Sequence, residues 1–167
     1  MVPVTVARLG LDSTSNTYVV LLKERDGDRV LPIWIGRPEA ESMAVQINGV
    51  KSERPMTHDL CQAIIIGLGA TLRRVQVTRV QDGTFFAELH LVRGAAAPVI
   101  IDARPSDSIA IALRLDAPIF VSEVLLGGEQ DGAPPEPAGR DDDTDSAERL
   151  QRYLEQLRPE DFGKFTL

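Results

Sequence analysis

The chain has 167 residues, 43% of them hydrophobic, which is enough to bury the core of a single domain. Its net charge of −7 is uneven: Gly127 to Leu167 holds 11 acids and 5 bases, whereas Met1 to Leu126 holds 14 and 13. The nearly neutral first part excludes a broadly basic surface for sequence-independent duplex binding. Because no long apolar run or apolar leader occurs, we expect a cytoplasmic protein without membrane contact.

The first third of the chain predicts three strands and a helix. Alternating β-branched and apolar residues separated by turn residues mark the strands, and Gly36 ends the third. Pro38 in a first turn with nearby acids then indicates a helix that stops near Gly49. The predicted strands are Val2 to Leu11, Thr17 to Lys23 and Arg29 to Ile35.

The middle of the chain predicts two further helices among four strands. We expect buried helices at Leu60 to Leu68, closed by Gly69, and at Ser106 to Leu115, closed by Asp116. The predicted strands are Thr71 to Val80, Thr84 to Val92, Val99 to Asp102 and Ile119 to Val121.

Composition divides the chain into three parts. Residues 1–126 carry the strands and helices, and residues 127–145 consist mostly of Gly, Pro, Asp and Glu, which is typical of a disordered acidic linker. Residues 146–167 contain an amphipathic helix with an apolar stripe that ends at Leu157. This stripe predicts docking on the same domain or on a neighbouring subunit, with a free partner-binding segment as the alternative.

A motif in which Arg-Pro leads into a hydroxyl residue and an acid occurs twice, each time before an apolar helical run. It reads Arg54-Pro55-Met56-Thr57-His58-Asp59 and then Arg104-Pro105-Ser106-Asp107. Proline favours an extended residue before it, and Thr57 and Ser106 are good N-cap types. Asp59 and Asp107 then lie against the positive end of each helix dipole. Two equivalent helix starts predict one composite site.

These motifs, with two others, resemble the bifunctional nuclease domain family. The resemblance spans about residues 2–126 and includes the segments Leu31-Pro32-Ile33-Trp34-Ile35-Gly36 with Glu39-Ala40, and Gly83-Thr84-Phe85-Phe86-Ala87. The second Arg-Pro motif matches as Asp102-Ala103-Arg104-Pro105-Ser106-Asp107-Ser108-Ile109-Ala110. The resemblance implies an α+β domain with a mixed, mainly antiparallel sheet and helices packed on it. It also implies cleavage of DNA and RNA and a homodimer or higher homo-oligomer.

The polar residues of the motifs supply the groups that phosphodiester hydrolysis requires. His58, Asp59, Asp102 and Asp107 are the predicted catalytic residues, and the three aspartates are also the predicted ligands of Mg²⁺ or Mn²⁺. Arg54 and Arg104 could clamp a phosphate bidentately, with Thr57 and Ser106 beside them as substrate-binding residues. The spacing of these residues does not by itself force them together.

Structural interpretations stand beside these catalytic ones. Asp102 and Arg104 could form an internal ion pair at the corner, His58 could be structural, and Glu39 could simply favour its helix start. Arg114 lies inside an apolar helix and therefore needs a carboxylate partner, for which Asp107 or Asp102 would serve. At the level of function, the alternatives are a non-catalytic module that binds a phosphate-bearing ligand or regulates a partner, and a purely structural motif.

Overall fold

A computed structural model describes residues 1–12 and 17–127. Its seven strands form one mixed sheet in the order β3-β2-β1-β7-β4-β5-β6. The strands are β1 Val2–Asp12, β2 Thr17–Glu24, β3 Val30–Ile35, β4 Thr71–Gln81, β5 Thr84–Val92, β6 Val99–Ala103 and β7 Ile119–Val121. Only β4 and β7 pair in parallel, and every other pairing is antiparallel. The predicted α+β class with a mainly antiparallel sheet is therefore confirmed.

The strand pattern follows the predicted alternation. Along β5, Ala87, Leu89 and Leu91 are buried, whereas Glu88 and His90 between them face the other side of the sheet. The short strand β7 joins the two halves of the sheet, because it pairs with β1 on one side and with β4 on the other. This connection brings the beginning and the middle of the chain into one core.

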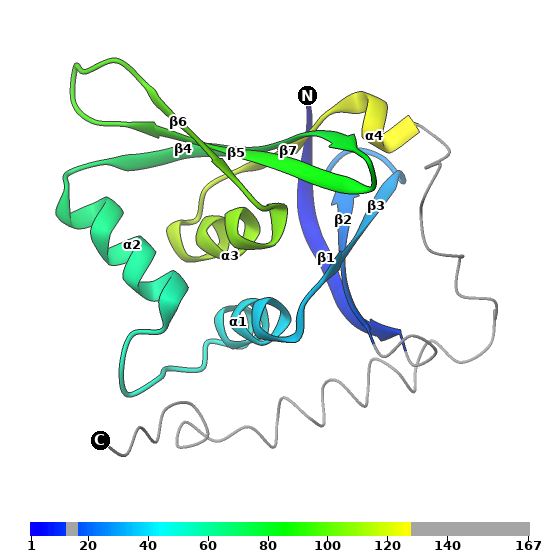
Figure 1. Cartoon of the computed structure of the whole chain (residues 1–167), viewed down its shortest axis with the longest axis horizontal. Helices are drawn as coiled ribbons and strands as arrows, with labels where there is room; N and C mark the ends of the chain where they lie inside the picture. Colours follow the sequence, from blue (N-terminus) through cyan, green and yellow to red (C-terminus); the bar gives the residue numbers. More distant parts are fainter. Residues whose placement is uncertain (13–16, 128–167) are drawn as a thin grey trace.

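Three helices lie together on one side of the sheet, as Figure 1 shows. The helices of the described chain are α1 Arg37–Ile47, α2 Thr57–Gly67, α3 Pro105–Leu115 and α4 Glu123–Gly127. The central α3 packs on both α1 and α2 and also on strands β4 and β5. Its apolar residues are almost all buried, as predicted, and Asp116 ends it with a φ of 49°.

Two expectations about the helices need correction. Helix α2 is not a buried helix, because only His58 and Ile65 of its eleven residues are buried. The helix lies at the end of the helix layer, where nothing among the described residues covers its outer side. The short helix α4 was not among the predicted elements.

The C-terminal predictions lie outside the described residues. Gly127 ends α4 and is also the last residue that the structure describes. The acidic linker predicted at 127–145 and the amphipathic segment predicted at 146–167 therefore remain predictions. Within the part of the chain that the structure describes, no helix is both long and apolar enough to cross a membrane.

Candidate functional site at the starts of three helices

Three helices carry an acid at the same position, the third residue after the N-cap. These acids are Glu39 in α1, Asp59 in α2 and Asp107 in α3, and the corresponding caps are Gly36, Met56 and Arg104. At this position a carboxylate lies near the unpaired N–H groups and the positive end of the helix dipole. The Asp59 carboxylate uses this position directly, since it accepts a hydrogen bond of 2.8 Å from the Met56 N–H.

The predicted caps Thr57 and Ser106 are wrong. Thr57 is the first residue of α2 and Ser106 is the second residue of α3, and the N-cap residues are Met56 and Arg104 instead. The two Arg-Pro motifs therefore differ by two residues in their position relative to the N-caps of their helices. Arg104 is itself the cap of α3, whereas Arg54 lies two residues before the cap of α2.

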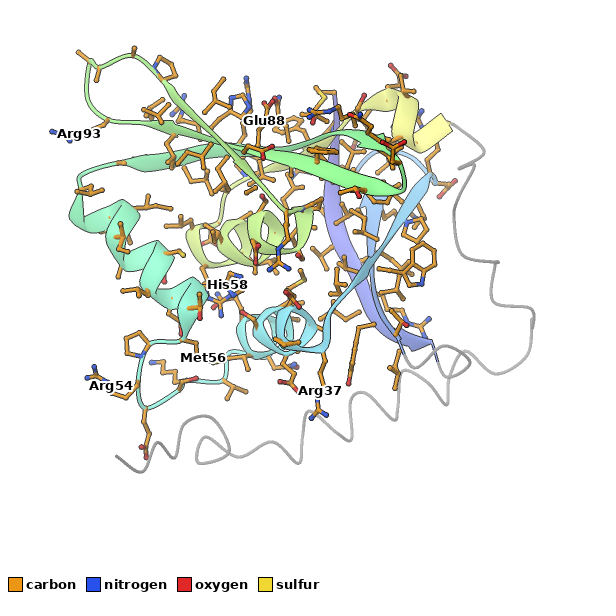
Figure 2. The ribbon with its side chains drawn as sticks, viewed as in Figure 1. Arg37, Arg54, Met56, His58, Glu88 and Arg93 are labelled. Carbon is orange, nitrogen blue, oxygen red and sulfur yellow. The ribbon has the colours of Figure 1, made fainter. Side chains whose placement is uncertain are left out.

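His58 joins all three helices. Its Nδ1 lies 2.8 Å from the Ser42 hydroxyl of α1, and its Nε2 lies 3.1 Å from Oδ1 of Asp107 in α3. A carboxylate can only accept a hydrogen bond, so in the neutral ring Nε2 carries the proton and Nδ1 accepts from Ser42. Figure 2 shows His58 at the junction of α1, α2 and α3. The two predicted helix starts therefore do meet.

Arg104 lies on the solvent side of this junction and links α3 to α1. Its Nε donates to Asp107 Oδ2 at 2.7 Å, and its terminal nitrogen lies 2.9 Å from Oε1 of Glu39. The Arg104 side chain is nevertheless 66% exposed, whereas that of Glu39 is 14% exposed. Arg104 is therefore the group of this site that a ligand from solvent would meet first.

Glu39, which the sequence explains as a residue that favours its helix start, also belongs to the site. Its carboxylate folds back over the start of α1, where a Cβ on Gly36 would collide with it. The signal in the sequence was its position, since Glu39 follows the helix start by the same number of residues as Asp59 and Asp107 do. Its contact with Arg104, 65 residues away, could be seen only in the folded chain.

A second ion pair lies deeper between α2 and α3. Arg114 is buried, and its Nε donates to Asp59 Oδ1 at 2.6 Å. Its other nitrogens donate to the carbonyl oxygens of Ala110 and Ser42 at 3.0 and 3.2 Å. The predicted need for a carboxylate is thus met by Asp59, and the predicted partners, Asp107 and Asp102, are wrong.

Asp102 and Arg54 are not brought to this junction. Asp102 pairs in register with Glu88, so it lies on the face of the sheet opposite the helices. The suggested Asp102–Arg104 ion pair is therefore wrong, because Arg104 binds Glu39 and Asp107 instead. Arg54 is exposed in the loop before α2 and projects away from His58 in Figure 2.

The two predicted hydroxyl residues differ in access to solvent. Thr57 is exposed in the first turn of α2, whereas Ser106 is buried in the first turn of α3. Only Thr57 could therefore contact a ligand without a change in the fold.

The residues present do not fit the predicted Mg²⁺ or Mn²⁺ site. Asp59 binds Arg114, Asp107 binds Arg104 and His58, and Asp102 lies on the other face of the sheet. In the part of the chain that the structure describes, no group of three His, Cys, Asp or Glu side chains could hold a metal ion. Divalent ions of this kind need several converging oxygen ligands, and these three aspartates do not converge.

Arginine contacts keep the two site aspartates ionised. Partial burial alone would raise the pKa of Asp107, but hydrogen bonds from Arg104 and His58 outweigh it and hold that pKa below its ordinary value. For Asp59, burial likewise raises the pKa, and hydrogen bonds from Arg114 and the Met56 N–H lower it further than burial raises it. The site therefore carries ionised carboxylates at neutral pH.

This lowering predicts a loss of stability in acid. Because the folded pKa of Asp59 and Asp107 lies below the unfolded value of about 3.9, their stabilisation is complete above about pH 5. It is then lost as the pH falls through the folded pKa values. Urea unfolding at steps between pH 7 and pH 3 should show this decrease, and the Asp59→Asn and Asp107→Asn variants should each show a smaller one. An equal decrease in all three proteins would contradict the assignment.

Comparison with known proteins identifies the family. Residues 20–131 match the bifunctional nuclease domain, about two thirds of the chain, so this chain belongs to the bifunctional nuclease domain family. An uncharacterized protein of Mycobacterium tuberculosis is 40% identical over 164 residues, which is 95% of this chain and 96% of the relative.

Plant members of the family are more distant. Bifunctional nuclease 1 of Arabidopsis thaliana is 32% identical over 109 residues, and Bifunctional nuclease 1 of Oryza sativa subsp. japonica is 25% identical over 113 residues. These matches cover 64% and 66% of this chain and 34% of each plant protein. This chain therefore matches about one third of the length of each of these plant proteins.

Proposed function

We propose that this protein hydrolyses phosphodiester bonds of DNA, RNA or both. Membership of the bifunctional nuclease domain family supports the class of reaction. The observation that carries the proposal for this chain is the 3.1 Å contact between His58 Nε2 and Asp107, because it joins the two Arg-Pro helix starts beside the exposed guanidinium of Arg104. A histidine that could act as base or acid and a cation that could bind phosphate thus lie side by side.

Arg104 would bind the substrate phosphate. Its guanidinium holds Asp107 through two nitrogens, at 2.7 and 3.1 Å, which is the geometry that a phosphate can adopt equally well. A phosphate that replaced Asp107 on this fork would be neutralised by Arg104 and would lie next to His58. The charge that develops on the phosphoryl oxygens would then be stabilised by a preorganised cation.

His58 would move the proton. Once Asp107 is displaced from Arg104, water would attack the phosphorus and give up its proton to the freed Asp107 carboxylate. His58, with a proton on each ring nitrogen, would donate its Nε2 proton to the leaving oxygen as the P–O bond breaks, while its Nδ1–H donates to the Ser42 hydroxyl. His58 is only 9% exposed, so this step requires the substrate to enter the junction rather than to pass over it. No step of this scheme uses a metal ion.

A nuclease assay with a matched arginine pair tests the proposal. The purified chain should cut end-labelled single-stranded DNA or RNA, and Arg104→Ala should lower the rate by about 100-fold through lost transition-state stabilisation. Arg93→Ala removes the same charge from an exposed loop distant from His58 and should leave the rate unchanged (Figure 2).

The same assay decides the metal requirement. We expect cleavage to continue in EDTA if the residues of this junction act alone, and to stop if a divalent ion is held elsewhere. Absence of cleavage of both substrates under every divalent ion would contradict the proposed hydrolysis.

A second function is a non-catalytic module that binds a phosphate-bearing ligand. The observation that favours it is that both ring nitrogens of His58 and both carboxylates around Arg104 are already engaged. Such a module would bind a labelled oligonucleotide without cutting it, and this binding would depend on Arg104. The two functions are thus separated by the fate of the bound strand.

A further inference from the structure

The carboxylate of Glu39 is directed at Arg104 rather than at the start of its own helix. Asp59, at the same position in α2, accepts a hydrogen bond from the N–H of its N-cap residue. Among the described residues the one polar partner of Glu39 is Arg104, at 2.9 Å. The Glu39 side chain is only 14% exposed, so water and salt screen its charge less than that of a surface carboxylate.

Gly36 leaves the space that this carboxylate occupies. A Cβ on Gly36 would collide with Oε2 of Glu39. The backbone itself does not require glycine there, because a φ of −73° and a ψ of 160° suit any residue. Glycine at this position is therefore explained by the close approach of the Glu39 side chain, and the segment Gly36 to Glu39 acts as one unit of the site.

Arg104 divides its guanidinium between two carboxylates. Its Nε and Nη2 donate to Asp107 at 2.7 and 3.1 Å, and the same Nη2 lies 2.9 Å from Oε1 of Glu39. In the proposed function a substrate phosphate replaces Asp107, whereas Glu39 keeps its place. The phosphate would then bind a cation whose single positive charge is already matched by one carboxylate.

We propose that Glu39 makes this site select internal phosphodiesters over terminal phosphates. The inference rests on the proposed function, because it takes Arg104 as the group that binds the phosphate. An internal phosphodiester carries one negative charge, whereas a terminal phosphomonoester carries about 1.5 to 2 at neutral pH. Repulsion by Glu39 grows with the charge of the ligand, so it weakens the binding of the monoester more. The substrate class is thus the interior of a strand rather than a phosphate at its end.

A purely positional role for Glu39 would have a different signature. If Glu39 only kept the guanidinium of Arg104 in place, its loss would weaken the binding of both kinds of phosphate by the same factor. If its charge selects between them, its loss changes the ratio of the two dissociation constants. This ratio is therefore the quantity that separates selectivity from support of the structure.

Binding of two small phosphates tests the selectivity without strand cleavage. Dimethyl phosphate carries one negative charge and methyl phosphate nearly two at about pH 7.5. Each is titrated into the full chain at low ionic strength while the NMR signal of the Arg104 Nε–H, assigned by its loss in Arg104→Lys, is followed. The wild type should bind dimethyl phosphate more tightly. Glu39→Gln keeps the shape and removes the charge, so the ratio should shift about tenfold towards methyl phosphate.

Two further variants make the result specific. Gly36→Ala displaces the Glu39 carboxylate by steric contact but keeps its charge in the protein, so it should shift the ratio in the same direction by a smaller factor. Glu41→Gln removes a carboxylate of the same helix and should leave the ratio unchanged. Glu41 binds Arg37 at 2.7 Å, and Arg37 points away from His58 in Figure 2.

The outcomes separate this proposal from the proposed function. A shifted ratio supports the selectivity even in a chain that cuts no strand, and the site is then that of a binding module. An unchanged ratio in Glu39→Gln, or an equal shift in Glu41→Gln, overturns the selectivity while phosphate binding by Arg104 stands. If neither phosphate moves the Arg104 signal at tens of millimolar, both the selectivity and the phosphate-binding role of Arg104 are wrong.

Discussion

Replacing Asp59 by alanine should lower the free energy of unfolding by about 3 kcal/mol, because it leaves the buried Arg114 without its carboxylate. The 2.6 Å bond from Arg114 Nε to Asp59 Oδ1 is the only contact with an ionised partner that Arg114 makes among the described residues. The variant also removes the acceptor for the Met56 N–H at the start of α2. Urea denaturation at neutral pH measures the change.

Two variants make this prediction specific. Asp102→Ala removes an exposed carboxylate that makes no hydrogen bond or ion pair with the described residues, and it should change stability by less than about 0.5 kcal/mol. Asp59→Asn keeps an acceptor for Met56 but loses the charge, so its cost should lie between the other two. Equal costs for Asp59→Ala and Asp102→Ala would show that the Arg114 pair does not stabilise the junction.

Replacing His58 by alanine should reduce nucleic-acid cleavage by about 10²–10⁴-fold, the usual contribution of a general acid or base. We expect the fall mainly in kcat, because Arg104 remains to bind the substrate phosphate. Single-turnover cleavage of a labelled strand measures the change in rate.

A second variant, Ser42→Ala, serves as the comparison for His58→Ala. Ser42→Ala leaves the imidazole in place and removes only the hydroxyl that donates to Nδ1, so it should lower the rate by less than His58→Ala does. Binding of the uncut strand should be retained in both variants. If His58→Ala cleaves as fast as the wild type, His58 is structural and the proposed proton transfer is wrong.

The sheet and most helices could be predicted because their signals are local. Alternation along β5 and glycine or proline at element ends depend only on residues close in sequence, and Gly69, with a φ of 68°, closes the turn after α2 as expected. By contrast, the face on which Asp102 lies could not be deduced. Val99, Ile100 and Ile101 are all apolar, so β6 has no alternation that distinguishes the helix side from the other side.

The site could be predicted in outline, since the two Arg-Pro motifs do meet. Their offset by two residues was present in the spacing, since Asp59 follows Arg54 by five residues and Asp107 follows Arg104 by three, but the wrong caps Thr57 and Ser106 concealed it. The contacts of Glu39 and Ser42 could not be predicted for a different reason: their partners, Arg104 and His58, are 65 and 16 residues away, and only the packing of the helices brings them together.

A double-mutant cycle between His58 and Asp107, measured as the rate of strand cleavage, tests the junction of the two helix starts most directly. If the two residues act as one unit, the His58→Ala, Asp107→Ala double variant should cleave no more slowly than the slower single variant. Losses that multiply, or a wild type that does not cleave, would contradict the account.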